Sequence, residues 1–444
     1  MAVMGNTQNL DLVQAVAKFS KYCDEIESLY EKSPLFIEKK GSSTCILNGG
    51  ATSALQRLIS VEVRKQAGIF FTSTDLADRV AKQLSPLLRM GVDLFDPACG
   101  AGNLLIACTR YLPSGESFDD TVRIWSELIR GYDLFPEFIR AARLRLAIAA
   151  ANRHPKEQIN LENMKTERLF EKLKTGDVFH AGETNPSTCV VVNPPFGYMP
   201  APKDCSWGNG RIQIAGWFVE RLLRMANEGQ HLVAILPDVL NSGTRYKLWR
   251  DTVCSLVSDI AVEQAGRFDP DTDVDVVIVH LIVGRGKDGS VEWPDNLPQT
   301  KGLTRKVSDC FESHVGAVVP HRDPNEGESY PYIHARTALA WQILENISER
   351  RRSIRRVFKP PFVVVHRTSS PSDKYRCVGS IVNESEEVAV ENHLIVLLPK
   401  DGSLESCKQL LESLKHTETN DWLNHRIRCR HLTIPALCDL PYYE

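Results

Sequence analysis

The sequence predicts an α/β protein with a mostly parallel central sheet, and three segments carry that prediction. Residues 92–103 combine a strand, a turn with two glycines and the start of a helix. Residues 129–133 form a second strand before a helical stretch at 137–152, and residues 189–192 are a short apolar run of strand type. Strands that alternate with helices build parallel sheets covered by helices on both faces, and this alternation extends over residues 67–286.

The segment before this sheet is predicted to be helical. Between Leu10 and Tyr30, apolar side chains recur at helical spacing, namely Leu12, Val16, Phe19, Cys23, Ile26 and Tyr30. We expect this stripe to pack on the remainder of the chain, and a partner subunit is the alternative. The polar, glycine-bearing stretch Gly41–Gly50 predicts a linker.

After the sheet, residues 284–298 contain Gly, Asp, Pro and Asn, which indicates a domain boundary. The remaining residues mix short strands, Phe362–Val365 and Leu394–Leu398 among them, with a helical stretch at Leu404–Lys415. The expected domains are an N-terminal helical segment at 1–60, an α/β domain at 61–290 and a C-terminal α+β domain at 291–444.

The composition predicts a soluble protein of the cytoplasm that contacts no membrane. Of the 444 residues, 43% are hydrophobic and 25% are charged, which is ordinary for globular proteins. No apolar run approaches the ~18 residues that a membrane span needs, and no signal-peptide pattern opens the chain. Twelve cysteines without a C-x-x-C pair argue against a zinc site or a disulfide scaffold, so we expect no metal. Because the net charge is only −3, nucleic-acid binding requires local clusters of Lys and Arg.

The tetrapeptide Asn193-Pro194-Pro195-Phe196 follows directly on the apolar run at 189–192. An Asn side chain and a neighbouring backbone carbonyl can accept hydrogen bonds from an exocyclic amine, and Phe196 offers a face for stacking. Proline fixes the backbone φ, so the carbonyls keep a defined direction. These properties suit a planar base that bears an amine; a plain surface turn after a buried strand is the alternative.

Acidic residues and glycines upstream suit a nucleoside-type cofactor. Gly100 and Gly102 allow a ligand to approach the backbone closely, and the absence of a G-x-x-x-x-G-K-[ST] motif argues against a phosphate cradle. Asp96 precedes the glycines and suits a positively charged ligand. Asp133, at the end of the second strand, is the type of residue that binds ribose hydroxyls, and Asp177 can accept a hydrogen bond from an adenine amine.

The motifs D-P-A-C-G-A-G (96–102), G-D-V-F (176–179) and N-P-P-F (193–196), in this order, resemble those of S-adenosylmethionine-dependent amino-methyltransferases. The N6-adenine DNA methyltransferases resemble the chain most. Gly68–Ala77 is similar to the extra motif that this family places before the glycine turn, an order typical of the γ class, which includes type I modification subunits and TaqI-like enzymes. The resemblance covers residues 60–285. It departs from the family in the long spacing between Asp96 and Asp133, which we attribute to a surface loop at Pro113–Val122, and in Phe196, where Tyr is frequent.

The resemblance implies a Rossmann-like fold, S-adenosylmethionine as cofactor and methyl transfer to the N6 amine of adenine in DNA, by direct displacement after base flipping. It places Asn193, Pro194, Pro195 and Phe196 at the target amine, with Phe268 as a candidate second stacking face. The residues that it assigns to the cofactor are Phe71, Thr72, Asp96, Ala98, Gly100, Gly102, Asp133 and Asp177. A restriction-modification role, with a specificity or restriction subunit as partner, would fit this family.

Basic clusters toward the C-terminus are the candidates for DNA contacts. The first contains Arg351, Arg352, Arg355, Arg356 and Lys359, and Arg367 follows a predicted strand further on. The second contains Arg426, Arg428, Arg430 and His431. Either cluster can equally be a solvated surface, because charged faces are common. The C-terminal domain is therefore a candidate for DNA recognition.

Two other functions share these motifs. RNA guanine-N2 and protein glutamine methyltransferases also use N-P-P-[FY], because their targets carry a comparable amine. A DNA-binding or complex-forming subunit that keeps the fold without catalysing transfer is the second alternative. Titration with S-adenosylmethionine separates that silent subunit from an enzyme.

Overall fold

The computed structural model of the chain describes residues 6–31, 45–155, 157, 169–181, 189–269, 272–284, 291–294, 305–371, 373–427 and 431–443. The chain divides into two units. The first unit contains residues 1–241 and 245–294, and the second contains residues 242–244 and 295–444.

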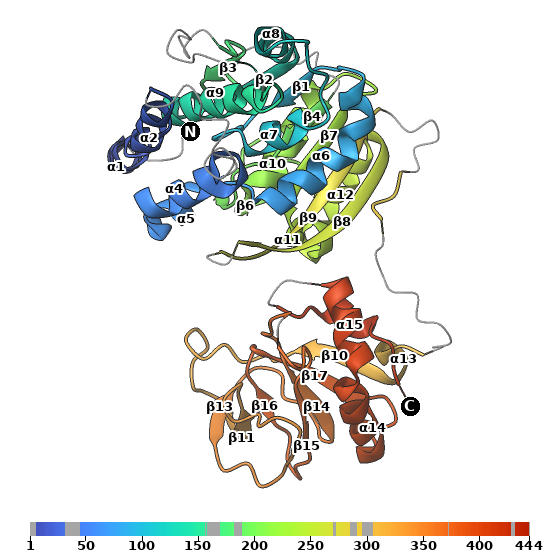
Figure 1. The fold of residues 1–444 in the computed structure, drawn as a ribbon. Coiled ribbons are helices and arrows are strands. Elements are labelled where there is room, and N and C mark those ends of the chain that lie inside the picture. The colour runs from blue at the N-terminus through green and yellow to red at the C-terminus, as the bar shows by residue number, and fades with distance from the viewer. Residues whose placement is uncertain are drawn as a thin grey trace. The chain divides into compact units, whose positions relative to one another are not determined.

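A seven-stranded sheet with the order β3-β2-β1-β4-β7-β9-β8 forms the centre of the first unit (Figure 1). Neighbouring strands from β3 to β7 are parallel, whereas β9 is antiparallel to both β7 and β8. The strands are β1 Leu94–Asp96, β2 Ile129–Asp133, β3 Leu173–Thr175, β4 Cys189–Val192, β7 His231–Pro237, β8 Val257–Asp269 and β9 Thr272–Val283. The strand order reverses between β1 and β4, and such a switch point opens a crevice at the carboxyl ends of the strands.

Helices cover both faces of this sheet. One buried cluster joins α6, α7, α8 and α9 to one face, and a second joins α10 and α12 to the other. These helices are α6 Thr74–Arg89, α7 Asn103–Thr109, α8 Phe118–Leu128, α9 Pro136–Ala151, α10 Ile214–Met225 and α12 Lys247–Cys254. The shorter elements are α11 Asp238–Ser242, η5 Thr244–Tyr246 and the two-stranded ribbon of β5 Tyr198–Pro200 and β6 Arg211–Gln213. The mostly parallel α/β fold that the sequence predicts is confirmed.

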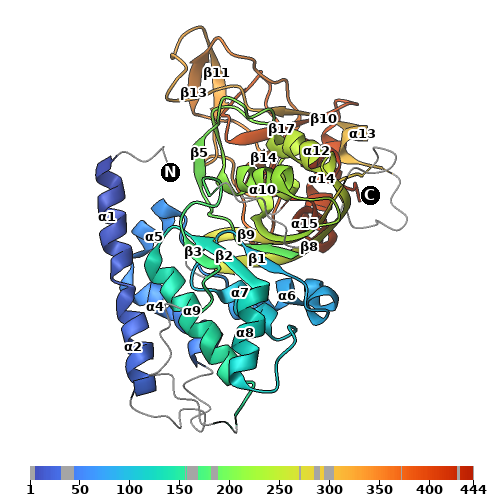
Figure 2. The ribbon, with the colours of Figure 1, turned by 90° about the horizontal axis from the view of Figure 1, so that it is seen from above.

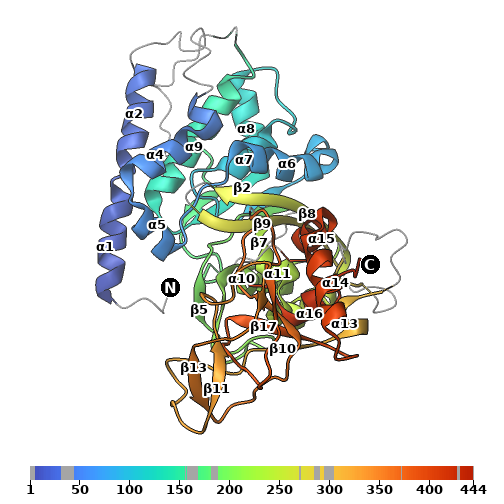
Figure 3. The ribbon, with the colours of Figure 1, turned by 90° about the horizontal axis from the view of Figure 1, so that it is seen from below.

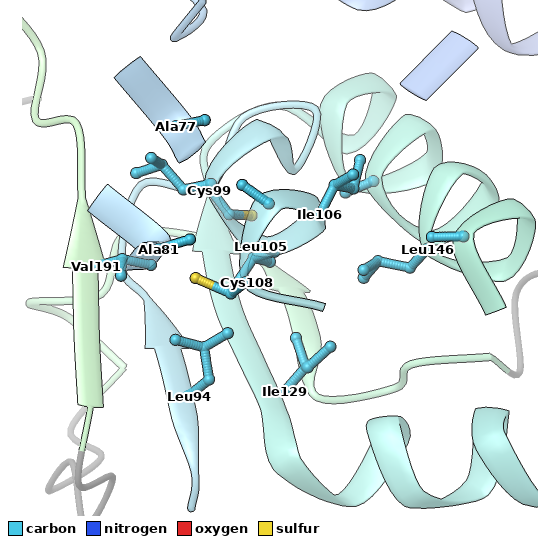
Figure 4. Close-up of a cluster of buried hydrophobic side chains, with 14 of the residues drawn as sticks. Ala77, Ala81, Leu94, Cys99, Leu105, Ile106, Cys108, Ile129, Leu146 and Val191 are labelled. Carbon is cyan, nitrogen blue, oxygen red and sulfur yellow. The ribbon is translucent and has the colours of Figure 1, made fainter. Parts of the chain in front are cut away.

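The first cluster lies beneath the glycine turn that connects β1 to α7. Figure 4 shows Leu94, Leu105 and Ile129 among the side chains of this core, with Val191 from β4 and Leu146 from α9. Cys99 and Cys108 are also buried in it, and burial raises the pKa of both thiols well above the ordinary value. Neither thiol therefore has the thiolate character that a nucleophile needs.

The N-terminal helices pack on the first unit itself. Leu12 and Val16 lie on α1 Asn6–Ala17, Cys23 and Ile26 lie on α2 Ser20–Glu31, and Phe19 lies in the turn between the two helices; all five are buried. They form one cluster with Phe71, Phe138 and Leu144, and Figure 2 shows α2 alongside α9. The apolar stripe was expected to pack either on the remainder of the chain or on a partner subunit, and the structure shows it packed on the remainder of the chain.

Two loop predictions are wrong. Residues 46–50 of the expected linker form a kinked helical turn, η2 Ile46–Gly50, with non-helical backbone angles at Asn48 and Gly49. α4 Ala51–Leu58 and α5 Val61–Ala67 follow it, and residues 41–44 lie outside the described part of the chain. The expected surface loop at 113–122 contains the start of α8, because Ser117 caps the helix by accepting a hydrogen bond from the Asp120 amide. Trp125 of α8 is fully buried and donates to the Pro113 carbonyl at 2.8 Å. An additional helix thus explains the long spacing between Asp96 and Asp133.

The second unit is an α+β structure, as predicted. A five-stranded sheet has the order β10-β17-β14-β15-β12, and a three-stranded sheet has the order β13-β11-β16. The strands are β10 Phe311–Val315, β11 Glu328–Ile333, β12 Ile343–Leu344, β13 Arg350–Ser353, β14 Phe362–His366, β15 Gly379–Val382, β16 Ala389–Val390 and β17 Leu394–Pro399. The helices are α13 Val307–Cys310, α14 Leu404–Lys415, α15 Thr417–Arg426 and α16 Ile434–Cys438. Most residues of the expected boundary at 284–298 lie outside the described part of the chain.

Among the described residues, no helix combines the length and the apolar character that crossing a membrane requires.

Candidate active site

Four polar residues that the sequence singles out lie at one edge of the central sheet. Asp96 ends β1, Asp133 ends β2, Asp177 follows β3, and Asn193 comes directly after β4. These strands are adjacent and parallel, so their carboxyl ends meet at the same edge. The crevice outside that edge is the usual ligand site of open α/β sheets.

Asp133 shapes the glycine turn. Its Oδ2 accepts a hydrogen bond from the Gly100 amide at 2.9 Å, and its Oδ1 accepts one from the Phe135 amide at 3.0 Å. The Tyr132 carbonyl accepts from the Cys99 amide at 2.8 Å, which adds a second bond between the turn and β2. Burial raises the pKa of Asp133 to about 6, against the lowering effect of the amide donors. The turn therefore depends on the carboxylate of the neighbouring strand.

Asp96 is buried, and one of its oxygens lacks a partner. Its Oδ1 accepts from the Ala98 amide at 3.1 Å, whereas Oδ2 has no hydrogen-bond partner among the described residues. Burial, with a smaller contribution from the Asp133 carboxylate, raises the pKa of Asp96 to about 8. An unsatisfied buried carboxyl oxygen is energetically costly. The site therefore suits a ligand that brings a hydrogen-bond donor or a positive charge.

Both glycines of the turn are required by their surroundings. Gly100 has φ +50°, and a Cβ there would lie 2.9 Å from the Phe71 ring. Gly102 has φ +81°, and a Cβ there would lie 3.2 Å from the Ala142 methyl group. Phe71 is itself buried against Phe138, with ring centroids 5.0 Å apart. The turn is thus pressed closely onto the segment that precedes α6.

That segment also holds Asn193 in place. The Asn193 side-chain amide donates to the Phe70 carbonyl at 3.1 Å, and its carbonyl oxygen Oδ1 is buried without a hydrogen-bond partner among the described residues. Gly68 lies so close to the tetrapeptide that a Cβ would meet the Phe196 carbonyl at 2.4 Å. The Thr72 carbonyl accepts a bond from the Asn103 side chain at 2.6 Å. Residues 68–72 therefore connect the N-P-P-F tetrapeptide to the glycine turn.

Phe196 and Phe268 are neighbours in an edge-to-face arrangement. Their ring centroids are 5.0 Å apart at an angle of 66°, and Phe268 is 6.4 Å from Phe70. Phe268 is buried in the core, whereas Phe196 is half-buried. The structure therefore places Phe268 as a support for Phe196, and its predicted role as a second stacking face stays a prediction.

Asp177 forms a tight turn after β3. Its Oδ1 accepts from the Phe179 amide at 3.0 Å, and its Oδ2 lies 2.9 Å from Nδ1 of His180. The Phe179 ring packs against Trp217 at 5.2 Å and lies under the Arg221 guanidinium at 5.4 Å. The Gly176 amide donates to the Asp133 carbonyl at 2.8 Å, which links this turn to β2.

Arg145 is a residue of this site that the sequence reasoning missed. It lies on α9, is fully buried, and donates to the carbonyls of Ala101 at 2.5 Å, Ile46 at 3.1 Å and Leu47 at 3.2 Å. It also donates to the Asn103 side-chain oxygen at 2.6 Å. Burial lowers the pKa of Arg145. The available signal was an arginine inside the apolar stretch Leu144–Ala151, where a charge must have several acceptors to be tolerated.

Arg145 connects three parts of the first unit. It joins the glycine turn at Ala101 to the N-terminal turn η2, and through Asn103 it reaches the Thr72 carbonyl. The hydrogen-bond acceptors described for Arg145 are all amide oxygens. At these contacts, amide dipoles therefore compensate the charge of the guanidinium group. The N-terminal segment is thereby bonded to the glycine turn at the carboxyl edge of the sheet.

The predicted DNA-contacting arginines of the second unit lie in and after β13. Several have partners within the unit: Arg355 binds the Asp323 carboxylate at 2.7 Å, Arg351 donates to the Asp323 carbonyl at 2.9 Å, and Arg356 donates to His314 at 3.2 Å. Arg352 is exposed, and no side-chain partner occurs for it among the described residues. Their role in DNA binding stays a prediction.

The other basic residues are less fully described. Arg367 is half-buried after β14, and its backbone amide donates to the His393 carbonyl. Arg426 lies 3.5 Å from the Asp439 carboxylate, whereas Arg428 and Arg430 lie outside the described residues. Within the described part of the chain, no group of three or more His, Cys, Asp and Glu side chains is arranged to hold a metal ion.

Comparison with known proteins identifies a matching family model and solved structures with a similar fold. Residues 54–228 match the model of the family described as N-6 DNA Methylase. The type IIL restriction-modification enzyme MmeI has a similar fold, with a TM-score of 0.50 and 12% identity over 88% of this chain and 70% of its own. The type IIG restriction endonuclease BpuSI matches 88% of this chain with a TM-score of 0.47 and 12% identity, and this chain spans 61% of its length.

A third solved structure matches part of this chain. It is described as a class I S-adenosylmethionine-dependent methyltransferase from Listeria monocytogenes, and it matches 63% of this chain and 89% of its own, with a TM-score of 0.41 and 16% identity. This chain itself combines a mixed α/β unit, whose central sheet is mostly parallel, with an additional C-terminal unit.

Proposed function

We propose that this chain transfers a methyl group from S-adenosylmethionine to the N6 amine of adenine in DNA. The observation that carries the proposal is the Asn193 side chain, whose amide is tied to the Phe70 carbonyl while its Oδ1 remains buried and without a partner. The Asn193 Oδ1 is thus a fixed hydrogen-bond acceptor that has no donor among the described residues, and it suits an incoming N–H group. The family match over residues 54–228 supports this reading.

The residues at the carboxyl edge of the sheet fit S-adenosylmethionine. When bound, this cofactor supplies a methyl group on a positively charged sulfur. The free Oδ2 of Asp96 suits its ammonium group, Asp133 suits its ribose hydroxyls, and Asp177 suits its adenine amine. Phe71, Thr72, Ala98, Gly100 and Gly102 would line the same site. The close packing of the glycine turn onto Phe71 gives the cofactor a preorganised surface.

Asn193 and Pro194 would act on the target amine. The Asn193 Oδ1 and the Pro194 carbonyl would each accept a hydrogen bond from one N–H group of the target amine. This arrangement favours a tetrahedral nitrogen whose lone pair points toward the methyl group. Because Phe70 anchors the amide, Asn193 cannot rotate to present its donor instead. Phe196 would stack on the flipped base, while Phe268 supports its edge. Catalysis would then consist of positioning and fixed dipoles, without a covalent enzyme intermediate.

DNA is the substrate that the comparisons favour. The family description names DNA, and MmeI was solved in complex with DNA. A duplex substrate requires the target base to leave the stack, at a cost of a few kcal/mol. We further propose the γ class, a DNA-recognition role for the second unit that includes Arg351, Arg352, Arg355, Arg356 and Arg367, and a place in a restriction-modification system with a specificity or restriction subunit.

Transfer of a labelled methyl group into duplex DNA, followed by nucleoside analysis, tests the proposal. Label in N6-methyladenine is the expected result, and the Asn193→Ala protein is the control. Labelled RNA or a labelled glutamine in a protein acceptor would identify a different substrate for the same site. Cofactor binding without transfer to any of these acceptors would indicate a silent subunit.

Replacement of Asp133 or Asp177 by alanine is expected to weaken binding of S-adenosylmethionine by about 1–3 kcal/mol, the value of a charge-assisted hydrogen bond. Asp133→Ala should also lower the free energy of unfolding, because the Gly100 and Phe135 amides lose their acceptor. Calorimetric titration measures the affinity, and Glu116→Gln, an exposed change before α8, is the control. Unchanged affinity in both variants would show that other residues hold the cofactor.

The binding of S-adenosylmethionine is expected to release a proton at pH 7. The pKa of Asp96 is about 8 without a ligand, so the carboxyl group is largely protonated there, and a bound ammonium group favours its ionised form. Affinity should therefore rise as the pH rises toward 8. Without the cofactor, the folded state retains a proton that the unfolded chain releases near its ordinary pKa, so the free energy of unfolding should fall between about pH 4 and pH 8.

Calorimetry at pH 7 in two buffers of different ionisation enthalpy measures this proton. About one proton should be released by the unmodified protein, and the release should be absent in Asp96→Asn. Proton uptake, or a release that survives the substitution, would remove Asp96 from the cofactor site.

A further inference from the structure

The ribbon of β5 and β6 begins two residues after Phe196. Its strands pair antiparallel, with Tyr198 opposite Gln213 and Pro200 opposite Arg211, and the Ile214 amide donates to the Gly197 carbonyl at its base. Figure 3 shows β5 near α10, the helix that follows β6. Any surface on this ribbon is therefore tied directly to the candidate base-binding tetrapeptide.

The ribbon is anchored on one face and open on the other. Ile212 and Trp207 are buried, Trp207 donates to the Glu220 carboxylate at 2.5 Å, and the Gln213 amide donates to the Tyr246 hydroxyl at 3.2 Å. Tyr198, Pro200 and Arg211 alternate with the inward residues and are exposed, Tyr198 at 48% of its surface. A large exposed aromatic side chain beside an arginine on a firmly packed ribbon indicates a binding face.

Two arginines on this surface, Arg211 and Arg245, form hydrogen bonds with backbone carbonyls and no salt bridge within the described part of the chain. Arg211 donates to the Tyr198 carbonyl at 3.1 Å, and Arg245 donates to the carbonyls of Asn209 at 2.9 Å and Arg211 at 2.5 Å. Among the described residues, neither guanidinium contacts an acidic side chain. Other exposed arginines of the first unit do have acidic partners, namely Arg57 with Glu25, Arg123 with Asp120 and Arg224 with Glu220.

We propose that the exposed face of the β5–β6 ribbon, with Arg211 and Arg245, binds the phosphate backbone of the DNA that flanks the target base. The proposal rests on the proposed function and adds a contact surface to it. Each guanidinium has N–H groups beyond those that hold the ribbon, and phosphates take such donors readily. Tyr198 packs against a sugar or a flanking base on the same face. The carbonyl contacts hold both guanidinium groups in position before DNA arrives.

The test is duplex binding over a range of salt concentrations with the double variant Arg211→Gln, Arg245→Gln. Its affinity should fall, and the slope of log association constant against log salt concentration should become shallower by about two units, one for each lost phosphate contact. Affinity for S-adenosylmethionine should be unchanged. The double variant Arg57→Gln, Arg123→Gln removes the same charge from carboxylate-paired arginines and should leave the slope unchanged.

A second double variant separates charge from structure. Arg211→Lys with Arg245→Lys keeps both charges and should retain most of the slope; loss of the slope there as well would mean that the arginines only shape the ribbon, which would overturn the proposal. An unaltered slope in the glutamine variant, with normal DNA methylation by the unmodified protein, would overturn this inference alone. Binding of RNA but not DNA by the unmodified protein would overturn the proposed function together with it.

Discussion

Asn193→Ala is expected to lower the rate of methyl transfer by a factor on the order of 10² to 10³, the effect of removing one preorganised dipole from an active site. The affinity for S-adenosylmethionine should change little, because the Asn193 side chain bonds to Phe70 and leaves its free oxygen for the target amine. Single-turnover transfer and calorimetric titration on the same preparation measure the two quantities separately.

Asn152→Ala, an exposed change at the end of α9, is the control for the transfer assay. Parallel losses of rate and cofactor affinity in Asn193→Ala would contradict the assignment and place Asn193 in the cofactor site. A loss of the folded state would indicate instead that its bond to the Phe70 carbonyl mainly supports the core.

Arg145→Met is expected to have the second large effect. It leaves the carbonyls of Ala101, Ile46 and Leu47 without their buried donor, which should lower the free energy of unfolding by about 2–4 kcal/mol. Since the glycine turn loses its support at Ala101 and Asn103, cofactor binding should weaken by about 1–3 kcal/mol. Denaturant unfolding and calorimetry under conditions where the variant is folded measure both effects.

Two comparisons make the Arg145 result specific. Arg145→Lys keeps a charge and some of the donors, so it should recover part of the affinity. Arg153→Met removes an exposed arginine that donates to the Thr109 carbonyl, without any contact to the glycine turn, and it should bind the cofactor normally. If Arg145→Met is unstable but binds the cofactor with full affinity, Arg145 supports the fold without positioning the turn.

The predictions that succeeded rest on local patterns. Two strand-forming runs end in Asp96 and Asp133, and a third ends directly before Asn193. Because these runs alternate with helices, they predict both the parallel sheet and the edge where these side chains lie. The loop prediction at 113–122 failed for a local reason as well: Ser117 is a helix-capping residue and apolar residues of α8 recur on its buried face, and composition alone obscured both signals. Arg145 was missed because its partners are far away along the chain.

The sequence by itself determined the α/β fold, the order of its strands along the chain and the candidate site residues, because turns, caps and apolar periodicity act between near neighbours. Only the tertiary structure decided how these residues are held. The bond between Asn193 and Phe70 spans 123 positions, and Arg145 reaches the glycine turn from α9. The raised pKa of Asp96 likewise arises from burial by segments that are distant in sequence. Desolvation and hydrogen bonding depend on which groups become neighbours in space, so no local pattern could have shown them.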